Sequence, residues 1–164
     1  MAQTSVCCII SLDYSITHKG GIFLIGNWKS ASHNKYLLQY HLIFVCKYRK
    51  KLLVSQQITY DVKVLSTEIC EKHGVSIKYM EADKDRIHYM IETRPNINLS
   101  DFVRTMKSYI TYHIWKKYSA YLHKCFWKEK TFFTDGYFIC SVGNVSEKTL
   151  KEYIENQDRR CSYE

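Results

Sequence analysis

The sequence predicts an α+β fold of the ferredoxin-like or RRM-like kind, a split βαβ arrangement in which an antiparallel sheet carries helices on one face. Segments with the two-residue period of a strand alternate with segments of helical period, in the order strand, helix, strand, strand, helix, strand, helix. The 164 residues suffice for one ordinary domain. Hydrophobic residues make up 46% and charged residues 24%, the balance of a globular protein rather than a disordered one.

The N-terminal segment is set apart from this pattern. Residues 1–34 have no clear period and end in a polar run, with one short strand expected at 22–25. We therefore expect a loosely attached, partly disordered extension over 1–34, a catalytic domain over 35–158 and a short tail over 159–164.

The first half of the domain begins with a strand over Leu38–Phe44, where alternate side chains fall on opposite faces. The strand ends at the basic cluster Lys47–Lys51. A helix is expected next and ends at His73-Gly74, because its apolar stripe has the spacing of one helical face: Ile58, Val62, Leu65 and Ile69.

Two further strands, over Val75–Tyr79 and Arg86–Glu92, flank the polar turn Ala82–Asp85 and should form a hairpin. Ser100 is a suitable N-cap for the second helix. The inner face of that helix is expected to carry Leu99, Val103, Met106, Ile110 and Ile114.

The chain then returns through a turn at Asp135-Gly136 into a last strand, Tyr137–Val142. Ser146 is expected to cap an additional C-terminal helix over residues 147–157, and this helix carries Tyr153.

Charge and cysteine content limit the partners. The net charge of +8 favours polyanions, nucleic acid first and an anionic membrane surface second. No apolar run is long enough to span a membrane, so we expect no membrane segment. The seven cysteines form no C-x-x-C pair, which indicates reduced, mostly buried thiols in the cytoplasm rather than a zinc site or a disulfide framework.

Two places can carry chemistry. On the third strand, Arg86, His88, Met90 and Glu92 share one face, and we expect the alternating apolar residues to meet the helices. On the last helix, Tyr153 and Gln157 are four residues apart and stack on one side. Taken singly, a strand histidine is more often structural than a metal ligand, and a helical tyrosine more often packs.

Together, four motifs resemble a known family. They are YHLIFVCKYRKK at 40–51, DRIHY at 85–89, YFICSVGNVS at 137–146 and YIENQ at 153–157. In this order they strongly resemble the single-tyrosine transposases of the insertion-sequence 200/605 group. Those proteins are small members of the HUH (histidine, hydrophobic residue, histidine) nuclease superfamily.

The resemblance implies a DNA transposase that nicks and rejoins single-stranded DNA at hairpin-marked element ends. Tyr153 falls on the nucleophile that forms a 5′-phosphotyrosine link, His88 on the second histidine of the metal motif, and Gln157 on a residue that completes the metal site in relatives. The resemblance also implies a divalent metal, Mg²⁺ or Mn²⁺, no nucleotide cofactor, and a homodimer in which the tyrosine helix serves either subunit.

Arg86 departs from the family pattern, which has a histidine at this position. A guanidinium has no acceptor and keeps its proton, so it cannot ligate a metal. Three explanations are open. The chain is a degenerate copy of a transposase, or Arg86 stabilises the phosphate directly, or the chain is retained as a DNA-binding protein. We favour an impaired or inactive transposase, with a catalytically inactive or domesticated binding protein for DNA hairpins as the alternative.

Basic and aromatic residues give the expected nucleic-acid surface, since such side chains contact phosphates without reading sequence. The candidates are Lys47, Arg49, Lys50, Lys51, Arg104 and Lys107. A solvated face explains these charges almost as well. Trp127, Phe132 and Phe133 are candidates for stacking on unpaired bases, but core packing is the expected role of all three. A small regulatory domain with an RRM-like sheet is the remote third hypothesis.

Overall fold

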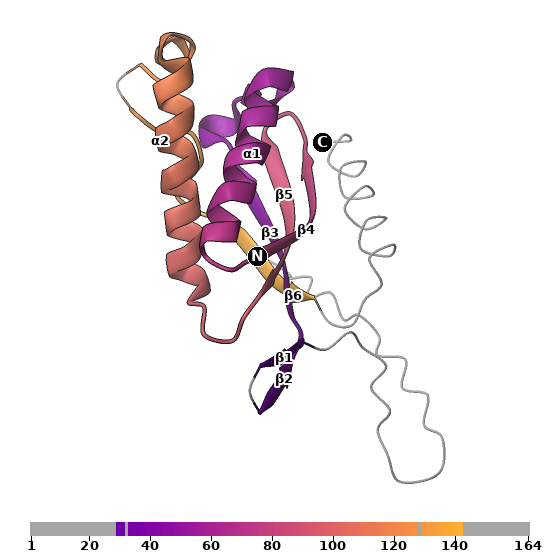
Figure 1. The fold of residues 1–164 in the computed structure, drawn as a ribbon. Coiled ribbons are helices and arrows are strands. Elements are labelled where there is room, and N and C mark those ends of the chain that lie inside the picture. The colour runs from indigo at the N-terminus through magenta and orange to yellow at the C-terminus, as the bar shows by residue number, and fades with distance from the viewer. Residues whose placement is uncertain (1–28, 32, 128, 143–164) are drawn as a thin grey trace, which may run out of the picture.

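The computed structural model describes residues 29–31, 33–127 and 129–142, and its centre is one antiparallel sheet (Figure 1). The four strands are β3 (Leu38–Val45), β4 (Ser76–Ala82), β5 (Arg86–Thr93) and β6 (Phe138–Val142). They lie in the order β4-β5-β3-β6, so the first and third strands of the domain occupy the centre. This order confirms the predicted split βαβ arrangement.

Two helices, α1 (Gln56–Lys72) and α2 (Leu99–Cys125), pack side by side on one face of the sheet (Figure 1). The alternation of the strands explains this layer, because only one of their two faces is apolar enough to meet the helices. The predicted inner stripes are confirmed at Ile58, Val62 and Ile69 of α1 and at Val103, Met106, Ile110 and Ile114 of α2, all of which are buried.

The helix-facing side of β5 consists of Ile87, Tyr89 and Ile91, all fully buried in the core. The Tyr89 hydroxyl lies 3.0 Å from the hydroxyl of Ser66 on α1, so the one polar atom of this aromatic side chain has a partner. His88 therefore points to the opposite face, as the sequence predicts.

Helix ends are set by local backbone chemistry. His73 ends α1, and Gly74 follows with a φ of 67°, a conformation that glycine adopts without strain. The predicted N-cap of α2 is wrong by two residues. Asn98, not Ser100, caps the helix, and its side-chain oxygen accepts hydrogen bonds from the backbone N–H of Ser100 at 3.1 Å and of Asp101 at 3.3 Å.

The described residues at the end of the expected extension are paired with the residues that follow them. Together they form a small β-hairpin from β1 (Lys29–Ala31) and β2 (Asn34–Tyr36). Lys29 is 2.5 Å from the carboxylate of Glu92, which is buried and also accepts a hydrogen bond from Gln39. Burial acts to raise the pKa of Glu92, but these partners outweigh it and the pKa is lowered. The carboxylate is thus charged and holds the hairpin on the sheet.

Several expected features lie outside the described residues, namely the strand at 22–25, the Ser146-capped helix at 147–157 and the tail at 159–164. Within the described part of the chain, no helix is long and apolar enough to cross a membrane. Cys46 and Cys70 are buried thiols, Cys125 is partly buried and Cys140 is exposed. Burial raises the pKa of both Cys46 and Cys70 to about 12, so these two thiols are inert rather than reactive.

Candidate active site

The face of the sheet away from α1 and α2 brings two histidines together at its centre. His88 on β5 pairs in register with Ile43 on β3, which places it diagonally beside His41 on the same face. The Nε2 of His41 lies 3.2 Å from the Nδ1 of His88, and the two rings stack at an interplanar angle of 17°. Both side chains are 1% exposed, so this hydrogen bond forms without competition from water.

His41 is neutral at physiological pH. Burial, and then the proximity of His88, lower its pKa from 6.5 to about 4. A neutral imidazole has one donor and one acceptor nitrogen, so the bond between His41 and His88 links the tautomer of one ring to that of the other. If the Nδ1 of His88 donates, its Nε2 carries the lone pair that a metal or a phosphate-bound proton requires.

His88 was predicted from the sequence as a candidate site residue, whereas His41 was not. The signal was present, because Gln39, His41 and Ile43 alternate on the same predicted face of a strand that becomes central in a split βαβ sheet. What the sequence lacks is the register between β3 and β5, which brings the two imidazoles within hydrogen-bond distance.

Arg86 begins β5 on the His88 face, two residues before the histidine. Its Nε is 3.3 Å from an oxygen of Asp85 and 3.9 Å from one of Asp83, both in the β4–β5 turn. The second oxygen of Asp85 is 2.6 Å from the Nε of Arg49. Arg86 is therefore part of an ion-pair cluster with the turn, at a position where the resemblance leads one to expect a histidine ligand.

A divalent metal is not accommodated by the described residues alone. Among them, no group of three histidine, cysteine, aspartate or glutamate side chains is arranged to hold an ion. His88 is one nitrogen donor and Arg86 supplies none. Tyr153 and Gln157, the remaining predicted site residues, lie outside the described residues.

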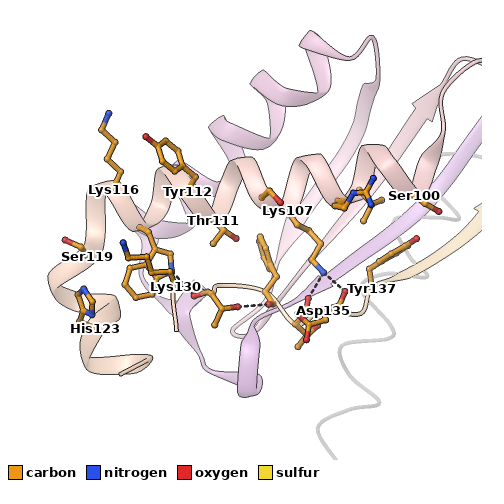
Figure 2. A pocket seen from close by; sticks show the side chains of 17 residues that line it. Ser100, Lys107, Thr111, Tyr112, Lys116, Ser119, His123, Lys130, Asp135 and Tyr137 are labelled. Atoms are coloured by element: carbon orange, nitrogen blue, oxygen red, sulfur yellow. Dashed lines mark hydrogen bonds between the residues drawn. The ribbon is translucent and has the colours of Figure 1, made fainter. Parts of the chain in front are cut away.

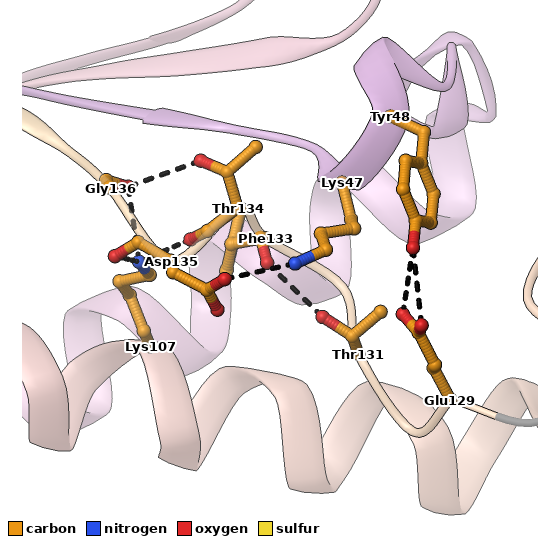
Figure 3. A network of polar contacts seen from close by, with 9 residues as sticks. All are labelled: Lys47, Tyr48, Lys107, Glu129, Thr131, Phe133, Thr134, Asp135 and Gly136. Atoms are coloured by element: carbon orange, nitrogen blue, oxygen red, sulfur yellow. Dashed lines mark hydrogen bonds and ion pairs between the residues drawn. The ribbon is translucent and has the colours of Figure 1, made fainter.

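The basic cluster after β3 is tied to acidic side chains from other segments (Figure 3). Lys47 donates to Asp135 at 3.0 Å, which raises the pKa of Lys47 and lowers that of Asp135. Tyr48 donates to Glu129, and it adopts a left-handed backbone with a φ of 58°. Such strain in a non-glycine residue requires support from its surroundings, and these side-chain contacts supply it.

The remaining predicted nucleic-acid residues differ in what they contact. The Nζ of Lys50 lies 5.8 Å from the ring centre of Phe126, and Lys51 is exposed. Arg104 is ion-paired with Asp101 within α2. Lys107 is only partly exposed and donates to backbone carbonyl oxygens in the segment that leads into β6, those of Thr134, Asp135 and Gly136 (Figure 3). Burial lowers the pKa of Lys107.

The three aromatic residues named as stacking candidates separate into two groups. Phe132 and Phe133 are 0% and 4% exposed and belong to the core, as expected. Trp127 is 84% exposed, so the expectation of core packing is wrong for this residue. Trp127 follows the end of α2, beyond the helical period that fixes which side chains face inward, so periodicity could not predict its exposure.

A groove runs between α2 and residues 130–137, with a volume of about 940 Å³ (Figure 2). Its lining includes Trp115, whose indole N–H donates to the carbonyl oxygen of Thr131 at 2.8 Å. Four cationic side chains and one carboxylate, that of Asp135, line the groove; the cations are Arg104, Lys107, Lys116 and Lys130.

Known proteins share both the sequence and the fold. A family model described as "Transposase IS200 like" matches residues 34–157. The transposase of insertion sequence element IS200 from Salmonella typhimurium is 26% identical over 133 residues, covering 81% of this chain and 85% of its own. The ISDra2 transposase TnpA of Deinococcus radiodurans is 27% identical over 122 residues, covering 74% and 85%. The crystal structure of a transposase candidate from the same organism superposes with a TM-score of 0.64 at 25% identity, covering 79% of this chain and 97% of that one.

Proposed function

The chain belongs to the IS200-like transposase family, and from this premise we propose that it nicks and rejoins single-stranded DNA through a covalent link to Tyr153. The observation that carries the proposal is the buried His41–His88 pair at the centre of the sheet face opposite the helices. His88, which we propose as the counterpart of the second histidine in the family's metal motif, lies on a strand paired on both sides, and such a rigid element supports a fixed orientation of a catalytic group.

The proposed reaction conserves the phosphodiester. The phenol oxygen of Tyr153 attacks the phosphorus and loses its proton to water, the bond from phosphorus to the 3′ oxygen breaks, and the departing 3′ oxygen takes up a proton from water. The strand then has a 5′-phosphotyrosine and a free 3′ hydroxyl. A 3′ hydroxyl later attacks the phosphotyrosine and releases the phenol. Because one ester replaces another at each step, the cycle needs no nucleotide cofactor.

The metal dependence that the family resemblance implies is also part of the proposal. A bound Mg²⁺ or Mn²⁺ ion polarises the phosphate. His88 and Gln157 are the proposed protein ligands, and Arg86 stands where a third is expected. We expect weak metal binding, because an ion that keeps much of its water shell depends on each protein ligand it has.

We propose DNA hairpins at the element ends as the substrate and a homodimer as the assembly. The edge position of β6 supports a dimer, because a strand with one unpaired side can be extended by a second copy. In the described part of the chain β6 pairs only with β3, and Phe138 on this strand is 53% exposed.

A second candidate function is a domesticated protein that binds folded single strands without cutting them. Arg86 favours it, since this side chain is tied into an ion-pair cluster and cannot serve as a ligand. Genomic context separates the two functions. Several copies with flanking DNA hairpins and matching ends indicate mobility, whereas a single copy without them indicates a retained binding protein.

The direct test is a nicking assay on single-stranded DNA spanning the ends of the encoding element, with wild type beside Arg86→His in the presence of Mn²⁺. An impaired transposase nicks slowly and is accelerated by the histidine. A protein that binds this DNA but nicks it in neither form is the domesticated binder. Equal nicking by both forms would show that Arg86 is no defect.

A further inference from the structure

The groove between α2 and residues 130–137 has the chemistry of a surface for a polyanionic strand (Figure 2). α2 has 27 residues and a single acidic one, Asp101 in its first turn. Apart from Arg104, which pairs with Asp101, its basic residues therefore have no carboxylate within the helix to neutralise them. The one acidic residue in the groove lining, Asp135, already binds Lys47.

The polar residues of α2 that line the groove form a stripe along the helix. Ser100, Arg104, Ser108 and Thr111 are spaced four, four and three residues apart, and Lys116 and Ser119 line the groove further along the helix. Hydroxyl and cationic side chains are the groups that contact phosphate oxygens without reading bases. The stripe runs from Ser100 to Ser119, or about 28 Å along the helix at about 1.5 Å per residue.

Exposed tyrosines distinguish an unpaired strand from a duplex. Tyr112 on α2 is 64% exposed and Tyr137, on the opposite side of the groove, is 40% exposed. Aromatic faces beside a basic groove stack on unpaired bases, whereas the faces of paired bases are covered by their neighbours in the duplex. The combination favours single-stranded DNA.

Lys107 shapes the groove rather than binding the ligand. Its amine is occupied by the carbonyl oxygens of Thr134, Asp135 and Gly136, which fix the facing segment against α2 (Figure 3). The cations left to meet phosphate are Arg104, which is ion-paired with Asp101 but has five donors, and the exposed Lys116 and Lys130.

We propose that this groove is a second DNA-binding surface, which holds the backbone of an unpaired strand on the helical side of the sheet, away from His88. The inference rests on the proposed function for the choice of DNA as the polyanion. A strand in this groove lies across the sheet from His88, so its role is to hold DNA next to the segment being cut rather than the scissile phosphate.

The test measures binding of an unstructured thymidine oligonucleotide to the full chain by fluorescence anisotropy over a salt titration. The groove variant is Lys116→Glu/Lys130→Glu. The matched control, Lys63→Glu/Lys84→Glu, makes the same change in net charge outside the groove lining. Loss of two phosphate contacts should reduce the slope of log affinity against log salt by about 1.4 in the groove variant, and weaken low-salt binding roughly 10-fold relative to the control.

A second pair of variants tests stacking without a change of charge. Tyr112→Ala should weaken binding roughly 5-fold or more. Tyr60→Ala, which removes an equally exposed tyrosine of α1 outside the groove, should leave binding unchanged. Circular dichroism melting of all four variants establishes that each is folded, and the uncharged Lys116→Gln/Lys130→Gln replaces the first variant if it is not.

Equal losses of DNA-binding affinity in the groove and control variants would overturn the proposal that the groove binds DNA, because only the overall charge would then attract the strand. If wild type forms a covalent DNA adduct while the groove and control variants lose binding equally, the proposed function stands and the groove does not bind DNA. If wild type forms no adduct while only the groove variants lose binding, the groove binds DNA and the proposed nicking function is wrong.

Discussion

At the scale of single residues, the contact between His41 and His88 determines what His88 can offer to a substrate. An imidazole that serves in catalysis or metal binding needs its second nitrogen held by a partner that sets ring orientation and tautomer. His41 does this from the neighbouring strand at 3.2 Å. Most histidines with this role are hydrogen-bonded to a carboxylate or a carbonyl oxygen. The neutral imidazole of His41 makes a weaker hydrogen bond to His88 than a carboxylate would.

Replacing Arg86 by histidine tests the proposed metal site. We expect Arg86→His to bind Mn²⁺ roughly 10-fold more tightly than wild type, because it exchanges a cation for a neutral nitrogen donor on the His88 face. Isothermal titration calorimetry measures the change. Arg94→His is the matched control, since Arg94 is exposed in the loop after β5. No gain at position 86, or the same gain at position 94, would contradict the assignment.

The burial of His41 also predicts how stability depends on pH. Its pKa is about 4 in the folded chain and about 6.5 when unfolded. Above pH 6.5 both states are neutral and the folded state keeps its full stability. As pH falls from 6.5 to 4 the unfolded state binds the proton first, so stability is lost. The loss amounts to about 3 kcal/mol from this residue.

Urea denaturation of wild type and His41→Gln, with EDTA present, measures this contribution. The two free energies of unfolding should run parallel above pH 7.5 and converge as the pH falls to 4, because only wild type has the buried imidazole. Curves that stay parallel down to pH 4 would show that His41 is not held neutral by the fold.

At the scale of elements, regular periodicity was enough to predict the sheet and both helices. β3, β4, β5, α1, α2 and β6 all begin within a few residues of the expected positions. The β1–β2 hairpin was not predictable in this way. Its six residues have no apolar alternation, and what holds it to the sheet is the ion pair from Lys29 to Glu92, a contact between residues far apart in sequence.

Contacts over long sequence separations also explain what was missed at the site. Lys107 was expected to contact phosphate, whereas it donates to carbonyl oxygens of a segment 27 to 29 residues further on. Lys47 and Arg49 likewise bind Asp135 and Asp85. Side-chain type gives charge, but the partner of a charge depends on loop placement, which a periodic pattern does not encode.

The N-cap of α2 is a point where prediction and structure disagree by two residues and where mutation distinguishes them. Asn98→Ala removes the acceptor for the N–H groups of Ser100 and Asp101, and should cost about 1 kcal/mol in the free energy of unfolding. Ser100→Ala, within the first turn, should change it by less than half as much. Urea denaturation compares the two variants, and a larger loss at Ser100 would contradict the cap.

At the scale of the whole molecule, the sheet separates two surfaces with different chemistry. One face carries the histidine pair, and the helical side carries the basic groove along α2. The net charge of +8 assists binding at both surfaces, because it attracts DNA to the molecule before either surface contacts it. Recognition of the family depended on four short motifs in order, and no single one of them distinguishes a catalytic residue from a packing one.

The central claim is that the phenol of Tyr153 attacks DNA held by the His88 face. It is tested most directly by incubating wild type, Tyr153→Phe and the control Tyr60→Phe with labelled single-stranded element ends and Mn²⁺, and then quantifying covalent protein–DNA adducts on denaturing gels. We expect a weak but measurable adduct in wild type and Tyr60→Phe, strengthened by adding Arg86→His, and none in any form that carries Tyr153→Phe. An adduct that persists in Tyr153→Phe would contradict the claim.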